Sequence, residues 1–229
     1  MKHLPNFITC LNLLSGCIGV VASFQGSLTI ACLAILVAAC FDFFDGMAAR
    51  LLHYTSPIGK ELDSLADVIS FGLLPSCIIY QLISTAIPAN NSLGYLAYGA
   101  FILTVFSALR LAKFNIDQRQ ASHFIGLPTP SSALVVCSLP FIIRQFPQWT
   151  FIQNHWLLLT LTLVLSGLLV AEIPLLSLKF KTFDLRSNLS RYILLLTGLI
   201  LLVFLNFAAV PLIIGIYIII SVIQFNGKT

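Results

Sequence analysis

Residues 27–49 read SLTIACLAILVAACFDFFDGMAA, and they set the class of structure to expect. Residues 27–41 contain no charged side chain, and such an apolar run is typical of a helix that crosses a lipid bilayer. Asp42 and Asp45 follow directly, although ionisable residues are rare within membrane helices and usually have a function there. The stretch therefore predicts a membrane helix that carries acidic chemistry near one end.

The whole chain has the same apolar character. Of its 229 residues, 59% are apolar and 9% are charged, against about 25% charged residues in an ordinary soluble domain. This composition excludes a soluble globular enzyme, a disordered chain and a nucleic-acid-binding protein, because each of them needs many more polar and charged residues. The ten-residue alternation of a β-barrel strand is also missing, so we expect an all-α, polytopic integral membrane bundle.

The apolar runs predict about eight transmembrane helices in a single domain over residues 1–229. No internal repeat and no Pro- or Ser-rich linker divides the sequence. The break between the last two runs, at residues 206–211, is weak, so seven spans is an alternative. The predicted spans cover residues 7–23, 27–49, 64–86, 93–112, 128–146, 155–176, 189–206 and 208–225.

The basic residues predict the orientation of these spans. With the N-terminus inside, eleven of the twelve Lys and Arg residues fall in inner segments, and only Arg144 falls in an outer loop. Because cytoplasmic loops carry an excess of Lys and Arg, we expect both termini in the cytoplasm. The inner residues are Lys2, Arg50, Lys60, Arg110, Lys113, Arg119, Lys179, Lys181, Arg186, Arg191 and Lys228.

Five of the eight acidic residues lie within residues 42–67, where the second predicted span ends and the third begins. Asp42 and Asp45 are three residues apart, and Asp63 and Asp67 are four apart, so each pair shares one face of a helix. If the two helices are antiparallel neighbours, the four carboxylates converge near the cytoplasmic surface of the membrane.

Carboxylates that converge in this way need a counter-charge, because like charges repel strongly in a medium of low dielectric constant. A site built from oxygen ligands alone favours Mg²⁺, Mn²⁺ or Ca²⁺ over zinc. A single aspartate at a helix end is usually just solvated, but this does not explain half of the acidic residues of the chain. The nearby small residues and Arg50 suggest a phosphate ester beside the metal.

The same residues form a longer pattern. The sequence from Asp42 reads DFFDGMAAR, followed after eight residues by Gly59 and then by Asp63 and Asp67. This pattern, D-x-x-D-G-x-x-A-R-x8-G-x3-D-x3-D, resembles the signature of the CDP-alcohol phosphotransferases. Residues 5–12, 63–75, 108–115 and 124–130 resemble the phosphatidylserine synthase branch of that family, with a weaker match over 173–179. Lys113 differs from the arginine that is more usual in this branch.

The resemblance implies an activity and a metal site. The implied reaction transfers the phosphatidyl group of CDP-diacylglycerol to the hydroxyl of L-serine, with release of CMP, at the cytoplasmic face of the cell membrane. The resemblance implies that Asp42, Asp45, Asp63 and Asp67 bind Mg²⁺ or Mn²⁺, as a pair of ions, and that Asp67 is also the catalytic base. Membrane lipid is then a partner, nucleic acid is not, and a homodimer is compatible with the resemblance.

Further residues are candidates for binding CDP-diacylglycerol. Gly46 and Ala49 allow a ligand to approach the backbone closely, Arg50 can contact phosphate, and the following loop contributes Ser56 and Gly59. The start of the first span contributes three polar residues as further candidates. The alternative is that they only cap the helix or lie at the surface. They are Asn6, Thr9 and Asn12.

The acceptor needs a partner for its carboxylate, and Arg110 is the best placed candidate. An arginine that only extends to the membrane surface is the alternative. Asn115 and the turn that contains Gly126 and Pro128 are expected to shape the acceptor pocket, although this turn can also be a simple start of a helix.

Other functions remain open at this stage. Another member of the same family would use a glycerol-phosphate, inositol-phosphate or choline acceptor. A phosphorylated acceptor needs several basic residues near the site, and choline needs a cage of aromatic rings. A divalent cation transporter is a more remote alternative, because it would place acidic residues at mid-membrane in two related halves.

Overall fold

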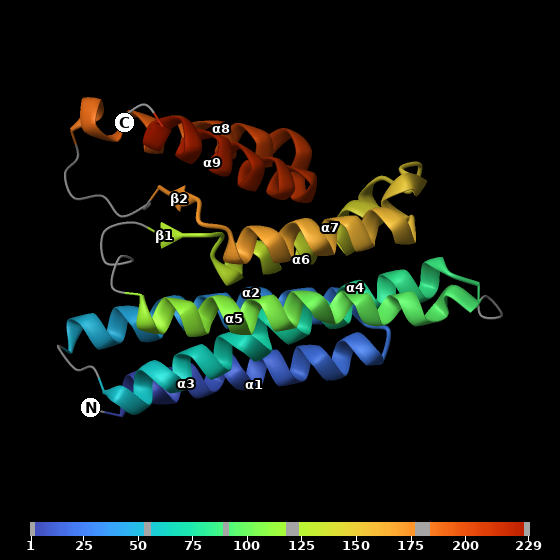
Figure 1. Cartoon of the computed structure of the whole chain (residues 1–229), viewed down its shortest axis with the longest axis horizontal. Helices are drawn as coiled ribbons and strands as arrows, with labels where there is room; N and C mark the ends of the chain where they lie inside the picture. Colours follow the sequence, from blue (N-terminus) through green and yellow to red (C-terminus); the bar gives the residue numbers. More distant parts are fainter. Residues whose placement is uncertain (1–2, 53–55, 89–91, 118–123, 177–183, 227–229) are drawn as a thin grey trace.

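The computed structural model of the chain describes residues 3–52, 56–88, 92–117, 124–176 and 184–226. These residues form a bundle of helices (Figure 1). The elements are α1 (Leu4–Phe24), α2 (Leu28–Leu51), α3 (Pro57–Asp67), the π-helix η1 (Val68–Leu73), α4 (Leu74–Ala86), the 3₁₀ helix η2 (Ser92–Phe101), α5 (Ile102–Ile116), β1 (Phe124–Ile125), α6 (Thr129–Gln145), the 3₁₀ helix η4 (Thr150–Gln153), α7 (His155–Val170), β2 (Pro174–Leu175), α8 (Leu185–Leu205), the 3₁₀ turn η5 (Asn206–Ala208) and α9 (Ala209–Asn226).

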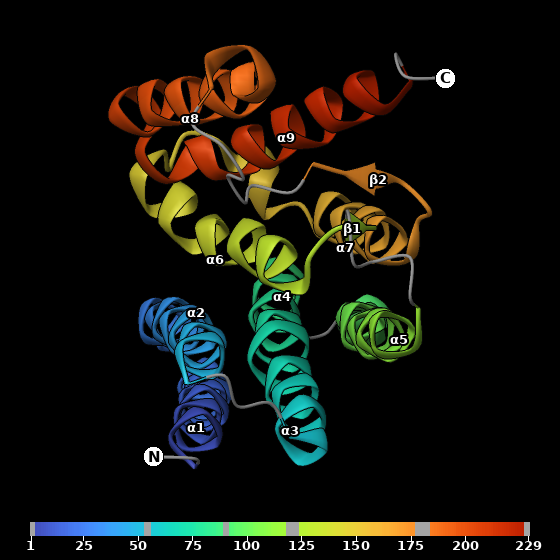
Figure 2. The same cartoon turned by 90° about the vertical axis from the view of Figure 1, so that its left-hand side faces the viewer.

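The helices are arranged around α4. Figure 2 shows α1 and α2 as a pair on one side of α3 and α4, with α5 on the other side and α6 to α9 above them. Phe71, Leu74, Ile78 and Ile83, from η1 and α4, are fully buried, which makes this continuous helix the centre of the apolar core. The start of α1, the end of α2, the start of α3 and the end of α5 all lie at one end of the bundle (Figure 1).

Five helices of the described residues are long and apolar enough to cross a membrane, judged by length and composition. The last of these runs contains α8, η5 and α9. Within it Asn206 has a positive φ of 50°, and α8 and α9 lie side by side as a hairpin (Figures 1 and 2). The prediction of an all-α membrane protein is confirmed, whereas the number of about eight spans stays a prediction. The runs are Leu4–Phe24, Leu28–Leu51, Pro57–Ala86, Ser92–Ile116 and Asn188–Phe225.

Two predicted spans have different limits in the structure. The third begins earlier, at Pro57, because Ser56 caps the helix by accepting a hydrogen bond from the Gly59 amide at 3.0 Å. The sixth, expected to reach residue 176, ends at Val170, and the chain then pairs in an extended form. There Phe124 of β1 lies opposite Leu175 of β2 in a short antiparallel pair.

The orientation in the membrane remains a prediction. Several basic residues that define it lie outside the described part of the chain: Lys2, Arg119, Lys179, Lys181 and Lys228.

Candidate active site

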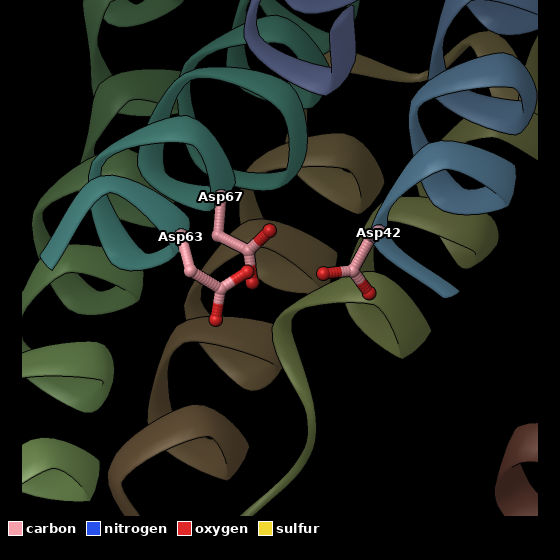
Figure 3. A group of neighbouring side chains, drawn as sticks. All are labelled: Asp42, Asp63 and Asp67. Carbon is pink, nitrogen blue, oxygen red and sulfur yellow. The ribbon is translucent and has the colours of Figure 1, made fainter. Parts of the chain in front are cut away.

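Three aspartates from two helices converge at one end of the bundle. Asp63 and Asp67 stand one turn apart on α3, and Asp42 faces them from α2 (Figure 3). One carboxylate oxygen of each residue lies within 4.8 Å of those of the other two. The predicted convergence of these three side chains is thus present in the structure.

Helix α1 supports the acidic residues through hydrogen bonds from its side chains. The hydroxyl of Thr9 donates a hydrogen bond of 2.6 Å to Oδ2 of Asp45, and Nδ2 of Asn12 donates one of 3.3 Å to Oδ1 of Asp67. Thr9, Asn12, Asp45 and Asp67 are all buried. Their role in binding CDP-diacylglycerol stays a prediction, and in the structure each of them also holds a carboxylate in place.

The donor set fits a hard divalent cation. Asp42, Asp63 and Asp67 offer only oxygen atoms, they come from two packed helices, and their separation suits a shared ion. Asp45 lies outside this group of three, although it is one helical turn from Asp42 on α2 and is oriented by Thr9. The residues therefore fit a metal site that can extend along α2.

A cavity of about 170 Å³ lies between α1, α2 and the start of α3. Six residues expected to bind CDP-diacylglycerol line it, together with two of the aspartates. Arg50 is exposed in the last turn of α2 and Asn12 is buried, and neither belongs to this lining in the described part of the chain. The lining residues are Pro5, Asn6, Thr9, Asp45, Gly46, Ala49, Ser56, Gly59, Lys60 and Asp63.

Lys60 was not identified from the sequence as a site residue. It lines the cavity, and its ammonium group donates a hydrogen bond of 2.7 Å to the backbone carbonyl of Asn115 at the end of α5. The Asn115 side chain in turn donates to the hydroxyl of Ser64 at 2.9 Å. Asn115 therefore joins α5 to α3. The spacing of Lys60 and Asp63, three residues on one helix, was the signal that could have identified the lysine.

Arg110 lines a second, smaller cavity of about 30 Å³. Arg110 is only 6% exposed, its guanidinium carbon lies 5.8 Å from the ring centre of Phe114, and its Nε has no hydrogen-bond partner among the described residues. It also lies near enough to Asp67 and Tyr217 for electrostatic interaction. The cavity is lined by Arg110, Lys113, Asp117, Ile125, Leu169, Val170, Ala171 and Glu172.

Gly126 and Pro128 follow one wall of this second cavity. Gly126 has a φ of +76°, and its amide donates to the carbonyl of Ile173 at 3.0 Å. Pro128 is extended and precedes the first turn of α6. Ile125, next to Gly126, lines the cavity, whereas Gly126, Pro128 and Asn115 are not among the lining residues in the ranges that the structure describes. Their role in shaping the acceptor pocket therefore stays a prediction.

Comparison with known proteins places this geometry in a family. A family model described as CDP-alcohol phosphatidyltransferase matches residues 2–168, which is most of the chain and includes all four aspartates. The chain belongs to the CDP-alcohol phosphatidyltransferase family. The resemblance stated from the signature is therefore confirmed, and the protein is an enzyme of a phosphotransferase family.

Individual members of the family are also similar to the chain. A protein of Bacillus subtilis named CDP-diacylglycerol–serine O-phosphatidyltransferase is 36% identical over 62% of this chain and 77% of its own length. A protein of the same name from Helicobacter pylori is 29% identical over 96% of this chain and 90% of its own length. An archaetidylserine synthase of Methanothermobacter thermautotrophicus is 36% identical over 59% of this chain and 56% of its own length.

Proposed function

We propose that this phosphatidyltransferase transfers the phosphatidyl group of CDP-diacylglycerol to the hydroxyl of L-serine, giving phosphatidylserine and CMP. The observation that carries the proposal is the 170 Å³ cavity, whose lining combines the small residues of the signature with Asp45 and Asp63. The names of the relatives support serine as the acceptor.

The large cavity suits the nucleotide end of the donor. Gly46 and Ala49 line the cavity, and a Cβ at Gly46 would meet nothing within 4 Å, whereas a Cβ at Gly59 would come within 2.9 Å of Oδ1 of Asn6. A nucleotide can therefore approach the backbone of α2 closely at Gly46, while Gly59 allows Asn6 to pack against α3. Lys60 supplies a positive charge at the same cavity, which suits the diphosphate.

The four aspartates would hold a pair of Mg²⁺ or Mn²⁺ ions. Such ions neutralise a diphosphate and stabilise the leaving CMP. The chain itself contributes the fixed position of the carboxylates, because Thr9 and Asn12 each donate to one of them. Fixed charges of this kind need no rearrangement during the reaction, and this lowers its barrier.

Asp67 is the proposed base. The serine hydroxyl oxygen forms a bond to the phosphatidyl phosphorus, the bond from phosphorus to the CMP oxygen breaks, and the hydroxyl proton passes to the Asp67 carboxylate. Asp67 suits this role because it is buried at the junction of α3 and η1, and it is near enough to interact electrostatically with Arg110. Asp67 is therefore the member of the acidic cluster that interacts electrostatically with Arg110 on the proposed acceptor side.

Arg110 is the proposed partner of the serine carboxylate. A buried guanidinium with an unused Nε binds a carboxylate strongly, because the charges interact in a poorly solvated place. Arg110 lines a cavity of about 30 Å³. The side chain is therefore placed where a small anionic group can reach it.

The membrane places both substrates at one interface. We propose eight spans and a site that faces the cytoplasm, because Lys60, Lys113 and Arg191 belong to helix ends on the same side of the bundle as the aspartates. At that surface, the acyl chains of the donor stay in lipid while serine arrives from water. We also propose that residues 1–229 act as one domain, since α9 packs on α6 and β2.

An acceptor panel tests the proposed reaction. Purified protein with CDP-diacylglycerol and Mg²⁺ or Mn²⁺ is assayed for CMP release with L-serine, glycerol 3-phosphate, an inositol phosphate or choline. Of these four acceptors, we expect only L-serine to support CMP release. Release with another acceptor in place of serine would contradict the assignment of serine and keep the family reaction.

A further inference from the structure

Half of the lining of the Arg110 cavity comes from the end of α7 and the segment that follows it. Leu169, Val170, Ala171 and Glu172 line the cavity together with Arg110, Lys113, Asp117 and Ile125. This segment therefore faces the residue proposed to bind the carboxylate of the acceptor.

The chain beyond Val170 is held in a defined place. The Gly126 amide donates to the Ile173 carbonyl at 3.0 Å, and Ile125 lies opposite Pro174 in the β1–β2 pair. A Cβ at Gly126 would lie 2.5 Å from the carbonyl oxygen of Leu169, so these two backbones are in close contact. We call residues 169–176 the acceptor strap.

Helix α9 fixes the other side of the acceptor strap. The Tyr217 hydroxyl donates to the Leu176 carbonyl at 2.9 Å, and the Leu176 amide donates to the Ser221 hydroxyl at 3.1 Å. Ser221 is itself oriented because its hydroxyl donates to the Tyr217 carbonyl at 2.7 Å. All three residues are buried. Both backbone polar groups of Leu176 are thus held by side chains of α9.

The acceptor strap brings an acidic residue to the basic cavity. Glu172 lines the same cavity as Arg110, and Arg110 is more than nine-tenths buried with Nε unused. An amino acid carries a carboxylate and an ammonium group a few ångströms apart. The lining also includes Lys113 and Asp117. A cavity that carries both basic and acidic side chains matches the two opposite charges of an amino acid.

We propose that Glu172 determines acceptor specificity by receiving the ammonium group of the acceptor, and that Tyr217 and Ser221 are positioning residues that hold the acceptor strap in place. This inference rests on the proposed function and adds the residue that distinguishes an amino alcohol from other alcohols. It assigns a role to α9, for which the sequence indicated only a membrane span.

The test compares L-serine with L-glycerate, which has a hydroxyl in place of the ammonium group. Wild-type protein should prefer serine in kcat/KM for CMP release. Glu172→Gln should reduce this preference about tenfold or more, which is the effect of losing one charge-assisted hydrogen bond. The KM for CDP-diacylglycerol should stay the same. Glu61→Gln, the same chemical change at an exposed residue of α3, is the matched control.

Glu172 is exposed, so its replacement does not threaten folding. An unchanged ratio between serine and glycerate in Glu172→Gln, with a wild type that uses serine, overturns this inference alone. A wild type that releases no CMP with serine overturns the proposed function as well.

The positioning role has its own test. Ser221→Ala should raise the KM for serine about fivefold, the effect of one hydrogen bond, and leave the KM for CDP-diacylglycerol unchanged. Ser138→Ala is the matched control, because Ser138 is an equally buried helical serine that donates only to Val135 of its own helix. Equal changes in both KM values, or the same change in the control, would show that α9 does not position the acceptor strap.

Discussion

Thr9 shows how a single neutral residue can control a charged site. Its hydroxyl lies 2.6 Å from Oδ2 of Asp45 and 3.0 Å from the carbonyl of Pro5, and its one proton serves the carboxylate. Without that proton, the buried Asp45 loses a donor that both lowers its free energy and fixes its orientation. The contribution of Thr9 is therefore felt through Asp45.

Replacement of Thr9 by valine tests this role. We expect the KM for CDP-diacylglycerol to rise about fivefold, the usual effect of one buried hydrogen bond, with the largest effect at limiting Mg²⁺. Steady-state CMP release measures it. Thr162→Val is the control, since among the residues that the structure describes the Thr162 hydroxyl bonds only to Leu158 of its own helix. Identical kinetics of Thr9→Val and wild type would contradict the role.

Gly46 offers a test that separates binding from stability. A Cβ at this position would meet nothing within 4 Å, and Gly46 lines the large cavity, so an added methyl group enters the space proposed for the nucleotide. Gly46→Ala should lower kcat/KM for CDP-diacylglycerol about tenfold and raise helix stability by about 0.5–1 kcal/mol. Enzyme kinetics and thermal unfolding in detergent measure the two effects.

Gly167 is the matched control for Gly46. It is an exposed helical glycine with open space around it, and it lies outside both cavities. Gly167→Ala should give the same gain in stability without a loss of activity. Full activity of Gly46→Ala would contradict the placement of the nucleotide.

Single residues of the site were predictable to different degrees. The aspartates and Gly46, Ala49 and Gly59 follow from their spacing along two helices, and the structure brings them to one place. The partners of Thr9 and Asn12 depend on how α1 packs on α2 and α3. That register is a tertiary property and leaves no local pattern in the sequence.

At the scale of elements, the turn at Gly126 precedes α6 and packs against the end of α7. Its φ of +76° is a conformation that residues other than glycine rarely adopt, and the Leu169 carbonyl occupies the space of a side chain. Gly126→Ala should therefore lower the Tm and raise the KM for serine, because the β1–β2 pair would shift. Thermal unfolding and acceptor kinetics check both effects.

A second variant, at Gly26, separates the effect of the positive φ from the effect of the close contact. Its φ of +77° is the same, but a Cβ there would meet nothing within 4 Å. Gly26→Ala should cost only the backbone strain of about 1–2 kcal/mol and leave the KM for serine unchanged. Equal losses of Tm in the two variants would contradict the close contact at Leu169.

The element boundaries show the limits of a sequence pattern. Hydrophobic runs predicted the long helices, but they continued through residue 176, where the structure has an extended strand. A pair of two-residue strands has no periodicity of its own, and the π-helix η1 keeps the apolar pattern of an α-helix. Both features depend on contacts between distant segments, such as the hydrogen bond from Ser70 to the carbonyl of Asn12.

At the scale of the whole molecule, the positions of the two chain ends bear on how many times the chain crosses the membrane. The start of α1 and the end of α9 lie at the same end of the bundle (Figure 1). An even number of crossings puts both termini on one side of the membrane, and the basic residues predict that this side is the cytoplasm.

Reporter fusions test this topology. A reporter at the N-terminus and one after residue 229 should both indicate the cytoplasm, and a reporter inserted near Thr150, in the turn between α6 and α7, should indicate the opposite side. Opposite locations of the two termini would favour the seven-span alternative. Composition and charge were sufficient to predict the membrane bundle, but not whether the hairpin at Asn206 crosses the bilayer twice.

The central claim is that the aspartate cluster, with a divalent metal, transfers a phosphatidyl group to serine. Its most direct test is the formation of phosphatidylserine and CMP from CDP-diacylglycerol and L-serine, followed by mass spectrometry over a titration of Mn²⁺ or Mg²⁺. Wild type and the Glu61→Gln control should form both products in equal amounts and only with metal, and Asp67→Asn should form neither while remaining folded. Metal-independent turnover, or full activity of Asp67→Asn, would contradict the account.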